Sequence, residues 1–214
     1  MGLLLLPKII PIVEGSGDVA AVPILLRNLL TELSRFDLQI GTPQNAHGCG
    51  NLTTPGGIER FVTNAWSKPD CGAVLILMDA ENQCPKRLAT DFSERIRMIG
   101  VRFPVVIVIA KCEYEAWFLA SVKTIAGRKL DGRPGLNAGL EYLDAVEERV
   151  GVKGWLTRQF PKGRIYKETL DQAAMTHFLD PVEARKHSRS FQRLCHALEQ
   201  IIEAIDNHQK IVTP

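Results

Sequence analysis

The 214-residue sequence predicts an α/β fold, in which a mainly parallel sheet is flanked by helices and followed by a helical C-terminal extension. Strand-like apolar runs alternate with segments of helical periodicity up to about residue 122. The strand-like runs are continuously apolar, which is typical of parallel strands that helices cover on both faces. Hydrophobic residues make up 45% of the chain and charged residues 23%, so the composition excludes intrinsic disorder and a fibrous protein.

The first strand and the first helix are distinguished by a change in the spacing of their apolar residues. Lys8–Val13 is a short strand that Gly15-Ser16-Gly17 ends, and apolar residues recur at helical spacing from Asp18 to Leu33. Pro23 lies in this helix and predicts that the helix starts late or bends. Phe36–Ile40 is a candidate second strand. Beyond a loop over residues 41–57, we expect strands at Ala73–Met78 and Phe103–Ala110, and helices at Ile58–Trp66, Lys86–Ile99 and Glu113–Val122.

The C-terminal third has a different organisation. A polar, glycine-rich segment covers residues 126–139, and helices are expected at about 139–150, 168–178 and 188–206. We therefore expect a four-stranded α/β core over residues 1–125 and a basic, helical extension over residues 126–214 that packs on it.

Cysteine usage and hydropathy limit where the protein acts. The five cysteines form no Cys-x-x-Cys pair, which argues against a disulfide framework and a zinc ribbon. The run Leu3–Leu6 resembles a targeting signal, but Pro7 and Lys8 interrupt it and no cleavage site follows. No stretch has the roughly 18 apolar residues that a membrane span needs. We expect a soluble, cytoplasmic protein, and the sequence leaves its oligomeric state open.

Acidic residues follow three successive strands. Glu14 ends the first strand and Asp18 lies one turn into the next helix, Asp79 and Glu81 follow the strand Ala73–Met78, and Glu113 follows the third strong apolar run. Ligands bind at the carboxyl ends of parallel strands, so we expect these five acids at one rim. Asp79 and Glu81 are two apart and would project the same way if the strand continued.

Clustered carboxylates repel one another and need a compensating cation. Oxygen ligands with no nearby His or Cys favour Mg²⁺ or Mn²⁺ over Zn²⁺, and such metals typically act on phosphates. We therefore predict Glu14, Asp79 and Glu81 as primary catalytic metal ligands, with Asp18 and Glu113 as supporting acids. Lys111 is a candidate for stabilising phosphate charge, or an ordinary strand-end lysine. The alternative for each acid is that it only caps a helix N-terminus.

The positive charge is concentrated in the extension. The net charge is only +2, yet residues 153–193 hold nine basic and four acidic side chains. Such a surplus could hold the phosphates of a nucleic acid beside the acidic rim, or could be a solvated surface in which Arg189 pairs with an acid of the core. The predicted contacts to the nucleic-acid backbone are Lys162, Arg164, Lys167, Arg189 and Arg193.

One motif suggests a different function. Gly15-Ser16-Gly17-Asp18-Val19-Ala20 fits the dinucleotide-binding pattern, but Glu14 places a carboxylate where a pyrophosphate would lie. No phosphate-loop lysine follows these glycines and no G-x-S-x-G elbow is present, which disfavours an ATPase or a serine hydrolase.

A Glu-Gly pair that ends the first strand and a D-x-[DE] pair that ends a later one resemble the Toprim fold of topoisomerases, primases and OLD-type nucleases. Five segments also resemble landmarks of a Toprim-like bacterial family of unknown function, whose members accompany ATPase genes in abortive infection and other phage defence. These segments are Val13–Asp18, Met78–Pro85, Glu113–Leu119, Lys167–Ala173 and Ser188–Phe191.

The resemblance implies a metal-dependent nuclease that cleaves DNA or RNA as the effector of a defence system and works with a separate ATPase. It implies Glu14 as the key acid, Asp79 and Glu81 as the D-x-D site, and Glu113 as the acid that precedes the family's tryptophan. Asp18 replaces the usual Glu, and Glu81 is one methylene longer than the usual Asp. These changes, with neutral residues where acids are common after Glu81, also favour the alternative of an inactive regulatory or binding subunit of an ATPase complex.

Overall fold

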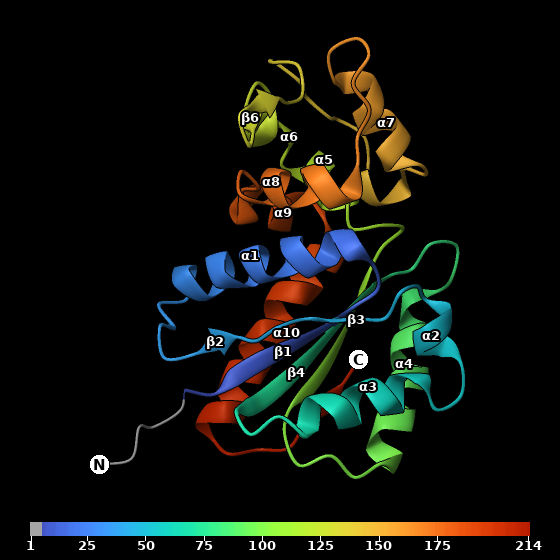
Figure 1. The fold of residues 1–214 in the computed structure, drawn as a ribbon, viewed down its shortest axis with the longest axis vertical. Coiled ribbons are helices and arrows are strands. Elements are labelled where there is room, and N and C mark those ends of the chain that lie inside the picture. Colours follow the sequence, from blue (N-terminus) through green and yellow to red (C-terminus); the bar gives the residue numbers. More distant parts are fainter. Residues whose placement is uncertain (1–5) are drawn as a thin grey trace.

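The computed structural model describes residues 6–214, so Leu3–Leu5 of the leucine-rich run lie outside the described residues. The described chain contains one main parallel sheet in the strand order β2-β1-β4-β5-β8, with β3 also paired to β1 (Figure 1). The strands are β1 (Lys8–Val13), β2 (Gln39–Ile40), β3 (Gln44–Asn45), β4 (Cys71–Asp79), β5 (Val105–Ala110) and β8 (Val212–Thr213).

This arrangement confirms the predicted α/β fold. The segment Ala73–Met78 lies within the central strand β4, which pairs with β1 on one side and β5 on the other. The sheet has more strands than the four expected, because β3 and β8 are two-residue strands at its margins. Such short pairings leave no periodic sequence signal.

Helices cover both faces of the sheet. Ile9 and Leu75 belong to the apolar core on the side of helices α1 (Ser16–Glu32) and α10 (Arg189–Asp206). Ile10 and Ile76 belong to the opposite core, against α3 (Gly57–Trp66) and α4 (Pro85–Met98). Because alternate residues of each strand face different helices, both sets must be apolar, and this explains the continuous runs in the sequence.

Helix α1 begins early, at Ser16, so of the two outcomes that Pro23 predicted, a late start or a bend, the late start is wrong. The Asp18 carboxylate accepts a hydrogen bond from the Gly15 backbone N–H at 3.0 Å, which satisfies one of the free donors at the helix N-terminus. Pro23 lies inside the helix and is buried. The cap therefore fixes the start of the helix at the end of β1.

The C-terminal third is largely helical, as predicted, but it differs in detail. It contains α7 (Val152–Gln159), the π-helical turn η2 (Glu168–Gln172), α8 (Ala173–Thr176) and α9 (Pro181–His187), before α10. The prediction of a helix at 139–150 is wrong, since only the 3-10 turn η1 (Val146–Glu148) forms there. Its apolar residues Leu143 and Val150 are exposed, so no buried stripe supports a helix.

Aromatic packing joins this region to the core. The expected helix at Glu113–Val122 is the short α5 (Ala116–Ala120), followed by α6 (Val122–Ile125). The Trp117 ring packs edge-on against Phe191 of α10, and its indole N–H donates to Ser190 Oγ at 2.9 Å. Trp117 and Phe118 are fully buried, so both belong to the core. The hairpin β6 (Lys129–Leu130) and β7 (Arg133–Pro134) and the short α2 (Gly50–Thr53) complete the fold.

None of the helices within residues 6–214 combines the length and the apolar character that crossing a membrane requires.

Candidate functional site at the strand ends

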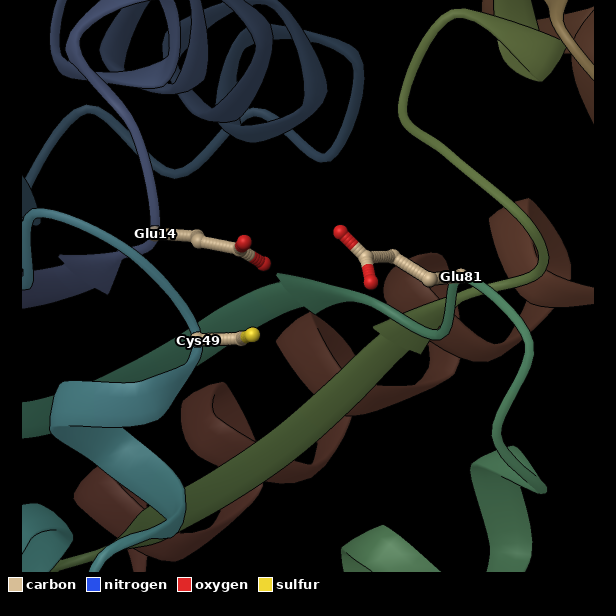
Figure 2. Close-up of side chains that lie close together, drawn as sticks. All are labelled: Glu14, Cys49 and Glu81. Carbon is tan, nitrogen blue, oxygen red and sulfur yellow. The ribbon is translucent and has the colours of Figure 1, made fainter.

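Two of the predicted acids meet at the carboxyl ends of β1 and β4. Glu14 follows β1, Glu81 follows β4, and Cys49 precedes α2, so three elements converge. One oxygen of each carboxylate and the Cys49 sulfur all lie within 4.8 Å of one another. Figure 2 shows the two carboxylates pointing toward each other, with the thiol beside them. We call Glu14, Cys49 and Glu81 the acidic rim.

The turn after β4 determines where Glu81 points. Its φ is 46°, in the left-handed region that side-chain-bearing residues adopt at a cost. The Glu81 backbone N–H donates to the Cys112 carbonyl at 2.8 Å, and Cys112 also has a positive φ of 65°. Extended geometry therefore ends at Asp79, and the expectation that Asp79 and Glu81 project the same way is wrong. Glu81 joins the acidic rim, whereas Asp79 is directed into a neighbouring, more buried group.

Asp18 and Asp79 belong to this second group, which we call the buried acid network together with Glu115, Glu168 and Lys153. Asp79 accepts a hydrogen bond from the Tyr114 backbone N–H at 2.8 Å. Asp18 accepts one from the Gln172 side chain at 2.7 Å, from the turn η2. The Asp79 backbone N–H donates to Glu14 at 3.2 Å, so Glu14 links the acidic rim to the buried acid network.

Lys153 of α7 provides positive charge inside the buried acid network. Its ammonium lies 2.6 Å from Glu168, 3.8 Å from Glu115 and 3.7 Å from Glu113. Glu115 is 1% exposed, and its carboxylate also accepts a hydrogen bond from the Tyr166 hydroxyl at 2.9 Å. The protein therefore supplies its own counter-charge here, whereas the described residues place no cation against Glu14 or Glu81.

Burial and mutual repulsion shift the titration of these acids. Burial is the main cause that raises the pKa of Glu14, and the charges of Glu81 and Asp18 add to it. Burial, with the charges of Glu115 and Asp18, holds the pKa of Asp79 well above its usual range. Burial also raises the pKa of Glu115 to about 8. A bound divalent cation would relieve this repulsion by favouring the charged carboxylates.

Glu113 and Lys111 lie apart from the acidic rim. The Glu113 carboxylate accepts a hydrogen bond from the Val152 backbone N–H at 2.5 Å, so it caps the N-terminus of α7. Lys111 lines a cavity with Cys84 and Arg189. The structure thus brings Glu14 and Glu81 together, whereas Glu113 and Lys111 make their contacts elsewhere.

Gly17 serves a packing role in the motif that fits the dinucleotide pattern. A Cβ at this position would lie 2.0 Å from the Gln172 side-chain oxygen and 2.9 Å from Glu168 Cβ. The glycine therefore lets η2 approach the start of α1, where Gln172 binds Asp18. This close approach accounts for the glycine without a pyrophosphate.

The predicted nucleic-acid contacts are divided between two places. Arg164 pairs with the buried Asp171 at 2.6 Å and stacks on the Phe160 ring at 4.2 Å, so its guanidinium is used within the fold. The neighbouring Lys162 and Lys167 are exposed. On α10, Arg189 is exposed at the cavity that Lys111 also lines. The Arg193 guanidinium instead donates to the Gln200 side chain and the Pro214 carbonyl.

Four residues of the two groups were not predicted as site residues: Cys49, Lys153, Glu115 and Glu168. Cys49 lies in a long irregular loop, where nothing in the sequence indicates that β3 and α2 bring it to Glu14. Lys153 was counted only as part of the basic extension. Glu115 carries a signal in hindsight, because it directly precedes the apolar run Ala116–Ala120, where a charged residue is expected to be buried and paired.

The donor set of the acidic rim fits a divalent cation. Two carboxylates suit Mg²⁺ or Mn²⁺, and the expected all-oxygen set gains the Cys49 sulfur, which adds affinity for softer metals such as Zn²⁺. Burial, Glu14 and Glu81 raise the pKa of the Cys49 thiol, so a metal that binds its thiolate must displace a proton.

Comparison with known proteins gives one family and one distant structure. Residues 13–199 match the family described as domain of unknown function (DUF4276). No curated protein matches the sequence. A solved structure, the C-terminal region of the Burkholderia pseudomallei OLD protein, aligns at 14% identity and a TM-score of 0.43 over 92% of this chain and 97% of that one. The match over residues 13–199 spans most of the sequence, and the chain therefore belongs to the DUF4276 family.

Proposed function

We propose that this protein is a metal-dependent nuclease that hydrolyses phosphodiester bonds of DNA or RNA. The observation that carries the proposal is the convergence of Glu14, Cys49 and Glu81 from three elements at the carboxyl ends of parallel strands. The Toprim-like order of acidic motifs along the chain supports the same reading.

In this proposal the two groups of acids have different roles. Glu14 and Glu81 hold the cation, and Cys49 is a third donor. Asp18 lies behind them and its charge adds to the repulsion that a cation would relieve, while the Asp79 backbone N–H holds the Glu14 carboxylate. A bound Mg²⁺ or Mn²⁺ supplies Lewis acidity, which activates water and balances charge on the phosphate. The half-buried Lys111 and the exposed Arg189, which line a common cavity, help to hold the phosphates of the strand.

Cleavage with matched variants tests the proposal. The purified chain is incubated with supercoiled plasmid or with single-stranded RNA and Mn²⁺. We expect cleavage that EDTA stops and that Glu14→Gln lowers at least about 100-fold, the scale for losing one electrostatic contact to the reacting group. Glu94→Gln is the control: Glu94 is exposed on α4, so this substitution removes the same charge outside the site. Cleavage that survives EDTA and Glu14→Gln would reject the site.

A binding or regulatory subunit is the second candidate. Two predicted ligands already have structural roles, since Asp18 caps α1 and Glu113 caps α7. In this case the protein acts by docking to an ATPase, the partner that the family resemblance implies. An ATPase that co-purifies with the tagged chain, together with Mn²⁺ binding but no cleavage of either nucleic acid, would favour this candidate.

A further inference from the structure

A cavity of about 560 Å³ opens at the carboxyl end of β5, between the N-terminal ends of α4 and α10. Cys84 and Lys86 line it from the start of α4, Arg189 from the start of α10, and Lys111 from the end of β5. Its apolar lining includes Ile107, Ile109, Pro85 and Ala89. The Glu147 carboxylate caps α10, so the N-terminal end of the 14-residue helix α4 is the one that directs a positive potential toward the cavity.

The charged lining is predominantly basic. Within residues 6–214, Lys86, Lys111 and Arg189 have no ion-pair partner. One carboxylate, Glu147, also lines the cavity, but it accepts hydrogen bonds from the Ser188 hydroxyl at 2.7 Å and the Ser190 backbone N–H at 2.6 Å. The cavity therefore has a surplus of positive charge that the fold leaves uncompensated.

Cys84 lines the cavity, and the pKa of its thiol is sensitive to this positive potential. Backbone N–H groups of Arg87 and Lys86 are the main cause that lowers the pKa of the exposed Cys84 thiol, and the charges of Arg87 and Lys111 contribute. The surroundings that stabilise a thiolate also stabilise a phosphate. Cys84 is fully accessible, so its alkylation can measure whether the cavity is occupied.

We propose that this cavity binds a nucleoside phosphate, with the phosphate against Lys111, Lys86 and Arg189 and the base against the apolar lining. The volume is within the usual range for small-molecule sites, roughly 300–1,000 Å³. Glu81 and Cys84 are the two ends of one turn, and Figure 2 shows the chain leaving Glu81 away from Glu14 toward α4. If the nuclease proposal holds, on which this step rests, the ligand is the phosphorylated end of the strand at the acidic rim. A free nucleotide has the same chemistry.

Protection of Cys84 from iodoacetamide, followed by peptide mass spectrometry, tests the proposal. Adenosine monophosphate should slow the alkylation by about tenfold once its concentration is ten times its Kd, by mass action. Adenosine without phosphate should not. Lys111→Gln combined with Arg189→Gln should abolish the protection, measured against the rate of that variant without ligand. The control is Arg102→Gln with Lys210→Gln, which removes two exposed charges at the opposite end of the sheet.

The same alkylation experiment with other ligands identifies the source of the phosphate. Protection by a 5′-phosphorylated oligonucleotide but not by its 5′-hydroxyl form assigns the cavity to a strand end, and protection by mononucleotides alone assigns it to a free nucleotide. Protection that persists in Glu14→Gln separates the cavity from the nuclease site, so either proposal can fail alone. No protection by any nucleoside phosphate, equal protection by adenosine, or protection retained in the Lys111/Arg189 variant would overturn the inference.

Discussion

The acidic rim and the buried acid network hold the same kind of side chain in different surroundings. In the rim, Glu14 and Glu81 face each other and Cys49, and no cation of the described chain lies against them. In the network, Glu115 and Glu168 surround the ammonium of Lys153. Glu81 is exposed, whereas Glu115 is almost completely buried.

This difference shows which of the neighbouring acids stabilise the fold and which are able to bind a cation. Buried carboxylates need a fixed counter-charge from the fold, because leaving a buried charge unpaired costs several kcal/mol. Once Lys153 supplies it, those acids hold α7 and η2 against the core. The rim acids retain solvent and unbalanced charge, so they are the ones able to recruit a cation.

The largest expected effect is the loss of Lys153. Lys153→Met removes the cation shared by Glu113, Glu115 and Glu168 and should lower the free energy of unfolding by about 2–3 kcal/mol at about pH 9, where Glu115 is ionised. The value is below that of a fully buried pair because the Lys153 side chain is 39% exposed. Urea denaturation measures it.

Lys123→Met is the matched control, since Lys123 pairs with Glu141 at the surface, where both side chains are more than half exposed. Its loss should change the unfolding free energy by less than about 1 kcal/mol. Equal losses in the two variants would contradict the assigned difference between buried and exposed acids.

A change of pH should have a smaller effect on the free energy of unfolding. Burial raises the pKa of Glu115 from 4.5 to about 8, so between these values the folded chain keeps a proton that the unfolded chain has lost. The free energy of unfolding should therefore fall as the pH rises from about 6 to 8, by about 2 kcal/mol. Glu115→Gln should flatten this slope in urea titrations at several pH values, whereas an unchanged slope would show that Glu115 is already ionised in the folded chain.

The smallest effect concerns metal preference at the acidic rim. Cys49→Ser replaces the soft sulfur by an oxygen, so affinity for Zn²⁺ should fall about tenfold while affinity for Mg²⁺ changes little. Competition against a chromophoric chelator measures both. A Zn²⁺ affinity that Cys49→Ser leaves unchanged would place the sulfur outside the metal site.

The fold was largely predictable from the sequence because its signals are local. Continuous apolar runs correctly indicated β1, β4 and β5, and helical periodicity indicated α1, α3, α4 and α10. The prediction of a helix at 139–150 was wrong because Leu143 and Val150 are exposed and Val146 alone of its apolar residues is fully buried. Glu147 from that segment instead caps α10, a tertiary contact that no local pattern reveals.

The sequence indicated the edge of the sheet at which the acids lie, but not which of them are neighbours. Chain topology fixes where strands end and so brings Glu14 and Glu81 together, whereas Asp18, Asp79 and Glu113, expected at the same rim, make their contacts elsewhere. The separation of Asp79 from Glu81 depends on one left-handed residue, and the arrival of Cys49 and Lys153 depends on how distant segments pack. Such contacts join residues far apart in the sequence, and periodicity carries no information about them.

Calorimetric titration with Mn²⁺ tests the central claim most directly, that the acidic rim binds a cation. We predict binding to the wild type, at least about tenfold weaker binding to Glu81→Gln, and unchanged binding to Glu94→Gln, which removes the same charge from an exposed position on α4. Wild-type affinity in Glu81→Gln, or no binding by the wild type, would contradict the account.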